Sequence, residues 1–327
     1  STIVVNYNGA PEIIEALESL ERQTLPPHEI IVVDNGSTDG SADLVEEQFP
    51  DVRLVRAGEN LGFAAGSNLG ASLATGRYLA LLNPDASAHP DWLRTLVTAL
   101  ESDDRFAVAV GKVYAGRSRT IEQAGAHFNN LGNYWGRGHL ELDEGQYDEV
   151  TEVTGLTGCA MLIDRDALHD EPMFDSDIFM YGEELDLTIR LRRRGYGVVY
   201  TPYAVVHHEG MASVRRSEQR PRVFQQRLSN RNRSRLLAKY YPSGILLRSA
   251  PLLILGLGYW FFWFLRESGP RAALELLIEI PRYFLRGRRE RKPASAEEDS
   301  LWLSLMTSHN LRGAVAQARR MKTTRAG

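Results

Sequence analysis

The amino-acid sequence predicts an α/β fold with a mostly parallel central sheet. Two observations support this prediction. Short apolar runs alternate with segments of helical periodicity through the first hundred residues, and two of these runs lead directly into an aspartate, Asp34 and Asp85. Alternating strands and helices are typical of parallel sheets, which bind ligands beyond the carboxyl ends of their strands. We therefore expect a site that includes Asp34 and Asp85.

The individual elements follow from the local pattern. Strands are expected where the sequence is short and apolar, at 2–5, 29–33, 52–56 and 78–82. Helices are expected where apolar residues recur at a spacing of three and four or where a turn precedes the segment, at 10–23, 41–48, 62–75 and 90–100. Farther along, we expect a strand at 107–114, a helix at 184–194 that stops at Gly195, and a strand at 197–201.

Composition limits the class of protein. With 327 residues, 43% of them hydrophobic, the chain can build one large domain or two small ones. Its single cysteine, Cys159, cannot form an intrachain disulfide, which fits a reducing compartment. Neither a G-x-G-x-x-G motif nor a P-loop follows a predicted strand, which argues against a dinucleotide oxidoreductase and a P-loop kinase.

The formal net charge of −4 hides a strong asymmetry along the chain. Residues 211–327 carry 23 Lys or Arg against 8 Asp or Glu, so residues 1–210 carry the remaining 15 basic and 34 acidic side chains. A basic C-terminal region joined to an acidic globular part suggests an anionic surface as partner. We therefore divide the chain into a globular domain at 1–213 and a basic, partly apolar helical region at 214–327.

The C-terminal region also contains an uncharged stretch of 17 residues, 249–265, with four consecutive aromatic residues at 260–263. This length is at the short edge of the ~17–25 residues that span a bilayer, and aromatic residues suit the headgroup interface. Basic segments at 215–239 and 282–292 flank the stretch on both sides. We therefore expect a hairpin or an in-plane amphipathic arrangement on the cytoplasmic face of a membrane, rather than a single span. The alternative is a buried core helix or an oligomer helix.

The two strand-end aspartates have a functional and a structural interpretation. Asp34 can accept the N3–H of uracil or thymine, or it can cap the following helix. Asp85 can supply a hard oxygen ligand to a divalent cation on a nucleotide diphosphate, or it can cap a turn.

The segment 174–213 carries the other candidates. Glu183, Glu184 and Asp186 begin a helix, where helix capping explains at least one of them, and either glutamate can act as a base. Asp186 is expected to pair with Arg190, four residues on, whereas 192–194 (Arg-Arg-Arg) is expected to be a solvated helix face. His207 and His208 follow a strand, so at most one of them faces the cleft.

Together these residues resemble family 2 glycosyltransferases with the GT-A nucleotide-sugar fold. The shared motifs occur in order over roughly residues 1–213: IVVNYN at 3–8, VVDNGSTDGS at 32–41, NLGFAAGSN at 60–68, LLNPDA at 81–86 and MYGEELDLTIRLRRRGY at 180–196. Within the family, the chain looks most like the bacterial rhamnosyltransferase branch, which builds cell-surface polysaccharide.

The resemblance implies a role for each position. Tyr7, Asp34 and Asn60 would contact the nucleotide. Asp85 matches the last acid of the family's metal-binding D-x-D motif, and Asn83 replaces the first. Glu184 matches the position of the catalytic base, where the family usually has aspartate.

His208 resembles the late metal or diphosphate contact, with His207 as the alternative. The implied enzyme is a metal-dependent, inverting glycosyltransferase that uses Mg²⁺ or Mn²⁺. Its donor would be a dTDP- or UDP-sugar, with L-rhamnose as the first choice, and its acceptor a glycan or a polyprenyl-diphosphate-linked sugar. Alternatives are a non-catalytic sugar-nucleotide or glycan-binding module of the same fold and a nucleotidyltransferase.

Overall fold

The structure is a computed structural model that describes residues 1–210 and 221–307. In these ranges ten strands form the central sheet, eight of them in the order β10-β12-β6-β11-β4-β1-β2-β3. β5 pairs with β12, and β7 pairs with β6. The strands are β1 (Thr2–Asn6), β2 (Ile30–Asp34), β3 (Arg53–Arg56), β4 (Tyr78–Leu82), β5 (Ala86–Ala88), β6 (Phe106–Ala115), β7 (Ile121–Ala124), β10 (Thr151–Val153), β11 (Ala160–Asp164) and β12 (Gly197–His208).

The predicted parallel arrangement is confirmed in the first part of the sheet. β1 pairs in parallel with β2 and β4, and β2 pairs in parallel with β3. β11 interrupts the pattern, because it runs antiparallel to both β4 and β6. Asn6 and Asp34 are partners at the carboxyl ends of β1 and β2, so the sheet places both at its ligand-binding edge.

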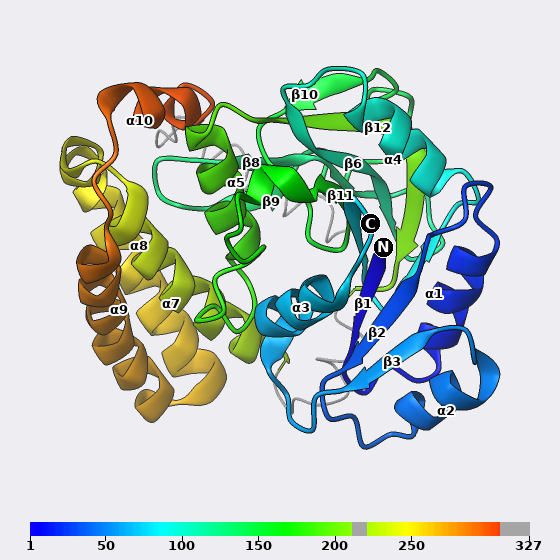
Figure 1. The fold of residues 1–327 in the computed structure, drawn as a ribbon. Helices are drawn as coiled ribbons and strands as arrows, with labels where there is room; N and C mark the ends of the chain where they lie inside the picture. Colours follow the sequence, from blue (N-terminus) through cyan, green and yellow to red (C-terminus); the bar gives the residue numbers. More distant parts are fainter. Residues whose placement is uncertain (211–220, 308–327) are drawn as a thin grey trace.

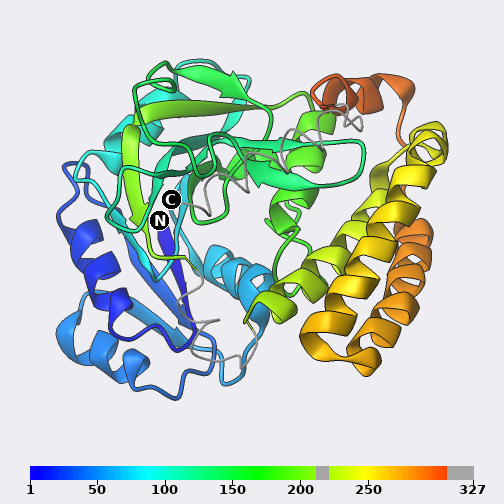
Figure 2. The same ribbon diagram turned by 180° about the vertical axis from the view of Figure 1, so that it is seen from behind.

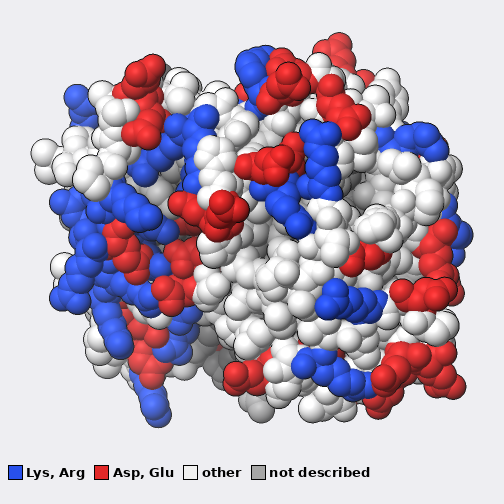
Figure 3. All heavy atoms as spheres, viewed as in Figure 1, with Lys and Arg blue, Asp and Glu red and all other residues white. Residues whose placement is uncertain are grey.

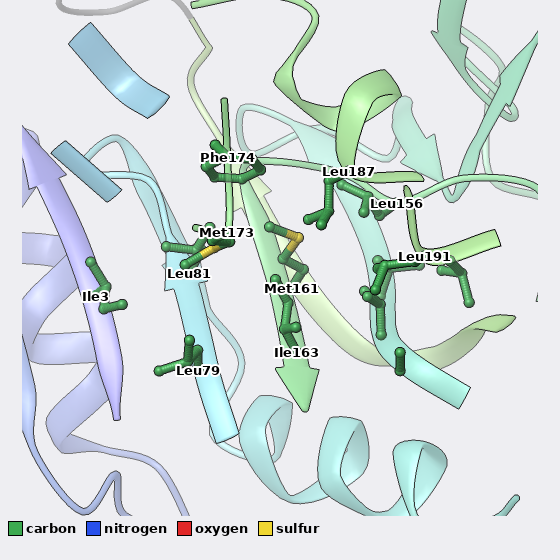
Figure 4. Packing of buried hydrophobic residues seen from close by; sticks show 14 of the residues in the cluster. Ile3, Leu79, Leu81, Leu156, Met161, Ile163, Met173, Phe174, Leu187 and Leu191 are labelled. Carbon is green, nitrogen blue, oxygen red and sulfur yellow. The ribbon is translucent and has the colours of Figure 1, made fainter. Parts of the chain in front are cut away.

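Helices cover both faces of this sheet (Figures 1 and 2). On one face, residues of β1, β2, β4 and β11 pack with α3 (Gly62–Leu73) and α5 (Glu183–Arg193). Figure 4 shows part of this cluster, including Met161 of β11 beside Leu187 of α5. On the other face, α1 (Glu12–Glu21), α2 (Ser41–Gln48) and α4 (Trp92–Leu100) cover the sheet. Alternate residues of each strand, such as Ile3 and Val4, therefore enter opposite cores.

The last strand differs from the prediction. β12 continues past 201 to His208, with an irregular register between Tyr200 and Val205. Its second half pairs in parallel with β6 and antiparallel with the short strand β5, which places His208 opposite Ala86. The two histidines thus belong to the strand rather than following it, and this pairing sets His208 beside the turn that carries Asp85.

The described part of the C-terminal region contains the helices α7 (Pro221–Tyr240), α8 (Ser243–Ser268), α9 (Pro270–Glu290) and α10 (Ala296–Leu303). α7, α8 and α9 lie side by side next to α5, and α10 lies at one end of this group (Figure 1). A small sheet of β8 (Ala126–Phe128) and β9 (Tyr134–Gly136) contributes to the same contact, since Phe128 packs against Trp302 of α10. The basic helix expected at 215–239 is described from Pro221 onwards, and residues 211–220 lie outside the described ranges.

Candidate functional site

One cavity of about 720 Å³ gathers most of the predicted site residues. Its walls come from the carboxyl ends of β1 and β4, the start of α5, the end of β12, the β8–β9 hairpin and one side of α7. The predicted residues that line it are Tyr7, Asn60, Asn83, Asp85, Glu183, Glu184 and His208. Asp34, Asp186 and His207 are not among the lining residues.

His208 is held between two carboxylates and an amide. Its Nε2 atom lies 3.1 Å from Asp85 Oδ1 and 3.2 Å from Asn83 Nδ2. Its Nδ1 atom lies 2.9 Å from Glu122 Oε2. Burial acts to lower the pKa of His208, but Cys159 and the carboxylates of Asp85 and Glu122 act to raise it, and the result lies well above the ordinary value.

The two neighbouring histidines point in different directions, as expected for adjacent strand residues. His207 Nδ1 lies 2.9 Å from the carbonyl oxygen of Gly116, and its ring stacks on Tyr114 with centroids 5.4 Å apart. His207 therefore supports the β6–β12 pair, and His208 faces the cavity.

The donor set at this end of the cavity fits a divalent cation with few protein ligands. No group of three or more His, Cys, Asp or Glu side chains within 1–210 and 221–307 could enclose a metal ion. Asp85 and His208 bring one oxygen and one nitrogen together, and a magnesium-type cation on a nucleotide commonly needs only one or two protein ligands besides phosphate and water. Glu122 on the second ring nitrogen is the arrangement that fixes the orientation of a metal-binding histidine.

Glu183 and Glu184 form a buried carboxyl pair at the start of α5. Burial raises the pKa of Glu183 well above its ordinary value, and the charge of Glu184 adds to this. Burial also raises the pKa of Glu184, although backbone N–H groups, including that of Gly158, act against the rise. A Cβ atom at Gly158 would lie 2.8 Å from Glu184 Oε1, so a side chain there would displace the Glu184 carboxyl. Carboxyls with raised pKa values in a cavity are suited to proton transfer.

The turn before α5 contains two consecutive residues with positive φ. Tyr181 has a φ of +67° and Gly182 a φ of +125°, which turns the chain directly into the helix that carries the glutamates. Asn232 of α7 stabilises this turn, because its Nδ2 donates to the carbonyl oxygens of Met180 at 3.0 Å and Tyr181 at 2.9 Å. α7 thereby helps to position Glu184.

Asp186 has a structural role in this fold. It is fully buried and accepts hydrogen bonds from Arg190 at 2.8 Å, Lys239 at 2.8 Å and Tyr240 at 2.6 Å. The predicted pairing with Arg190 is therefore confirmed. Burial acts to raise the pKa of Asp186, but the charges of Arg190 and Lys239 outweigh it and lower this pKa to about 2.

The expectation of a solvated arginine face at 192–194 is wrong. Arg192 is 4% exposed and binds Glu152 and the carbonyl oxygen of Val153 on β10. Arg193 pairs with Asp299 of α10 at 2.7 Å. Two elements far away in the sequence thus cover the side of α5 that the local pattern assigned to solvent.

The expected nucleotide-binding residues lie where β1 and β2 end and in the loop between β3 and α3. Tyr7 lines the cavity and is half-buried, and Asn60 lines it from an exposed loop, with its Oδ1 accepting from the N–H of Gly62 at 3.0 Å. Asp34 is 3% exposed, and it accepts from Asn6 Nδ2 at 3.2 Å and from the N–H of Ser37 at 3.3 Å. Its neighbour Asn35 lines the cavity instead.

Among the lining residues that the sequence did not predict are Glu122, Arg233 and Trp260. They come from β7, α7 and α8, which reach the cavity only through tertiary packing. Glu122 lies in the short strand β7, which the local pattern did not predict, and the basic run around Arg233 was interpreted as a contact with an anionic surface.

Comparisons with known proteins agree with this geometry. The family model described as "Glycosyl transferase family 2" matches residues 1–171. The chain is 29% identical over 237 residues to the N-acetylglucosaminyl-diphospho-decaprenol L-rhamnosyltransferase of Mycobacterium tuberculosis, which covers 65% of this chain and 77% of that protein. It is 31% identical over 207 residues to the glucosyl-dolichyl phosphate glucuronosyltransferase of Haloferax volcanii, which covers 60% of this chain and 63% of that protein.

Solved structures share the fold at low sequence identity. GalNAc-T7 with UDP, GalNAc and Mn²⁺ superposes with a TM-score of 0.58 at 15% identity, covering 74% of this chain and 48% of that one. The mannosyltransferase PcManGT from Pyrobaculum calidifontis, in complex with GDP-Man and Mn²⁺, has a TM-score of 0.51 at 17% identity, covering 98% of this chain and 79% of that one.

Proposed function

This chain belongs to glycosyl transferase family 2 and has the GT-A fold, and from that premise we propose an inverting, metal-dependent sugar transfer from a dTDP- or UDP-sugar. The transferred sugar is L-rhamnose by first choice, and the acceptor is a glycan or a polyprenyl-diphosphate-linked sugar. The observation that carries the proposal is the single cavity that joins Tyr7, Asp85, Glu184 and His208.

The donor end of the cavity is the end near Asp85. Asp85 and His208 would hold Mg²⁺ or Mn²⁺, and this cation would supply the positive charge that stabilises the departing nucleotide diphosphate. Glu122 keeps the His208 ring oriented through its contact with Nδ1. Tyr7 would lie against the base, and we assign the choice of base to Asp34 at the end of β2, although Asp34 is buried behind the residues that line the cavity.

Glu184 performs the proton transfer. Its carboxylate accepts the proton of an acceptor hydroxyl, whose oxygen forms the new bond to C1 of the sugar. The bond from C1 to the diphosphate oxygen breaks on the opposite side, and the configuration at C1 inverts. This route needs no covalent sugar–enzyme intermediate.

The choice of sugar, acceptor and location rests on similarity and on the C-terminal helices. The mycobacterial relative is named as a rhamnosyltransferase that acts on a lipid-linked diphosphate sugar. Within the described residues, one helix, α8, is long and apolar enough to cross a bilayer, by length and composition only. We propose that the enzyme works at the cytoplasmic face of a membrane, held there by α8 and α9.

The deciding experiment is a transfer assay of the purified full chain with a panel of nucleotide sugars, with Mg²⁺ or Mn²⁺ present and with excess chelator. We expect release of dTDP or UDP that depends on the cation and is fastest with dTDP-rhamnose. Binding of sugar nucleotides without release under any condition would instead identify a non-catalytic binding module. A preference for GDP-sugars would refute the assignment of Asp34.

A further inference from the structure

The wall of the cavity formed by α7 carries a cation that the donor site does not use. Arg233 lines the same cavity as Asp85 and Glu184, and Trp260 of α8 lines it as well. Asn232, the neighbour of Arg233, anchors the turn before Glu184. The α7 wall is therefore fixed relative to the base.

The partners of Arg233 are neutral. Its Nη1 donates to Asn133 Oδ1 and its Nη2 to Asn230 Oδ1, both at 2.6 Å. In the part of the chain that the structure describes, no carboxylate forms an ion pair with it. Two other α7 arginines are different: Arg227 pairs with Glu279 at 2.7 Å, and Arg235 pairs with Glu290 at 2.7 Å.

A buried guanidinium without a counter-charge is costly, and burial lowers the pKa of Arg233 to about 10. The two amide oxygens orient the guanidinium of Arg233 without neutralising its charge. They leave its remaining N–H groups available as donors. A guanidinium with free donors in a cavity is well suited to binding phosphate oxygens.

The position of the site indicates which anion it takes. The donor diphosphate is already assigned to the end of the cavity near Asp85. Trp260 also lines this cavity, and it lies on α8, a helix whose exposed surface is apolar, including Ile254 at 69% and Phe262 at 68% exposed. An anion that arrives beside such a helix is best supplied by a lipid that carries its own diphosphate.

We propose that Arg233, held by Asn133 and Asn230, binds the diphosphate of a prenyl-linked acceptor and so presents the acceptor sugar to Glu184. This inference rests on the proposed glycosyltransferase function and specifies the acceptor class of the same cavity. Arg233 is a binding residue for the acceptor and has no part in donor recognition.

The test compares Arg233→Gln with Arg222→Gln in the full chain. Arg222 is an exposed arginine on the same helix that does not line the cavity, so the control has the same charge change. Calorimetry with geranyl diphosphate, inorganic diphosphate and dTDP separates the lipid-borne anion, the free anion and the donor. Arg233→Lys retains the positive charge and shows whether the planar guanidinium is needed. Circular dichroism checks that each variant is folded.

We expect Arg233→Gln to weaken geranyl diphosphate binding at least ~10-fold, the scale of one lost hydrogen bond to a charged group, and to change dTDP binding less than ~2-fold. Arg222→Gln should leave both unchanged. Equal weakening of dTDP, binding of inorganic diphosphate as tight as that of geranyl diphosphate, or unaffected geranyl diphosphate binding would each overturn the proposal. Arg233-dependent geranyl diphosphate binding without any dTDP binding would support the anion subsite and refute the transferase instead.

Discussion

At the scale of single residues, Glu183 and Glu184 share one cavity but differ in how their charged forms are stabilised. Both line the cavity, and burial raises the pKa of both. Backbone N–H groups act to lower the pKa of both carboxyls, but the Oε2 atom of Glu183 is buried with no hydrogen-bond partner among the described residues, and the charge of Glu184 raises the pKa of Glu183 further. Of the two, Glu184 is therefore the one better able to carry a negative charge, as a general base requires.

We expect Glu184→Gln to reduce kcat by at least ~10²-fold, the usual scale of a lost general base, because an amide cannot accept the proton. Donor binding should remain, since the substitution preserves size and removes none of the groups that we assign to the donor. Single-turnover transfer and dTDP calorimetry measure the two quantities separately. The matched variant Glu183→Gln should retain most of its kcat, and the opposite ranking would assign the base to Glu183.

The raised pKa of Glu184 also determines the pH dependence. The carboxyl is protonated and inactive below its pKa, so kcat/KM should rise with pH through a midpoint above the ordinary glutamate value. Initial rates measured between pH 4 and 9 at fixed ionic strength would show this rise in kcat/KM. The affinity for dTDP, measured over the same pH range, should not fall in the same way at low pH, because the rise in kcat/KM reflects proton transfer rather than donor binding. A midpoint at or below the ordinary value would contradict a buried base.

The metal end of the cavity allows a separate prediction. Asp85→Asn should abolish most turnover and weaken Mn²⁺ binding, because it replaces the only carboxylate we assign to the cation. Titration of Mn²⁺ followed by paramagnetic relaxation of water measures binding without activity. Glu122→Gln, which keeps the residue size, should weaken Mn²⁺ binding by roughly 10–100-fold, as for other outer-shell partners. Full activity in excess chelator would remove the metal from the mechanism.

At the scale of elements, the contact between α5 and α7 holds the site together. Asp186 on α5 accepts hydrogen bonds from Lys239 and Tyr240 of α7, and Asn232 of α7 binds the turn before α5. The C-terminal helices thus help to position Glu184, in addition to any contact with a membrane.

Asp186→Asn is expected to cost roughly 3–5 kcal/mol, as when one partner of a buried ion pair is removed. The folded-state pKa is about 2, below an unfolded value of about 3.9, so Asp186 stabilises the protein fully above pH ~4 and loses this effect as pH falls towards 2. Denaturant unfolding of both proteins should therefore show a large difference at pH 7 and a smaller one at pH 3. Glu46→Gln, in an exposed pair with Arg56, is the control and should change little.

The elements that the sequence predicted are those with a strong local pattern. The 41–48 helix and the 78–82 strand have the expected bounds, and Asp85 follows its strand as expected. β12 was predicted too short because its second half is stabilised by pairing with β5 and β6, which adjacent residues do not reveal. Glu122 and Arg233 were missed for the same reason: each enters the cavity from an element whose position depends on contacts with distant segments.

At the scale of the whole molecule, charge and apolar surface are separated. Lys and Arg gather over the C-terminal helices, and Asp and Glu gather over the region of α2 (Figure 3). α8 and α9 also expose large apolar side chains, including Leu247 at 77%, Ile254 at 69% and Ile278 at 68%. Only 6% of the most apolar 18-residue segment of α8 is buried, so the alternative of a buried core helix is wrong in this structure.

This surface predicts binding to anionic membranes. The full chain should float with vesicles that contain phosphatidylglycerol, because each basic residue near such a surface contributes about 1 kcal/mol and the apolar side chains of α8 enter the interface. Removing α8 to α10 is a poor test, since Ser234 and Arg235 of α7 bind α9. The double variant Leu255→Glu, Phe262→Glu changes exposed positions of α8 and leaves the packing of α7 intact.

The double variant should lose most of its flotation and keep its cooperative unfolding. Tyr203→Glu is the matched control, because Tyr203 on β12 is 64% exposed, close to the 68% of Phe262, but lies outside the C-terminal helices. Flotation of the control should equal that of the unmodified chain, and raised salt should weaken both as it screens the basic face. If the unmodified chain stays in the soluble fraction and sedimentation shows a dimer that the α8 substitutions dissociate, the exposed face of α8 is an oligomer interface, and the membrane proposal is wrong.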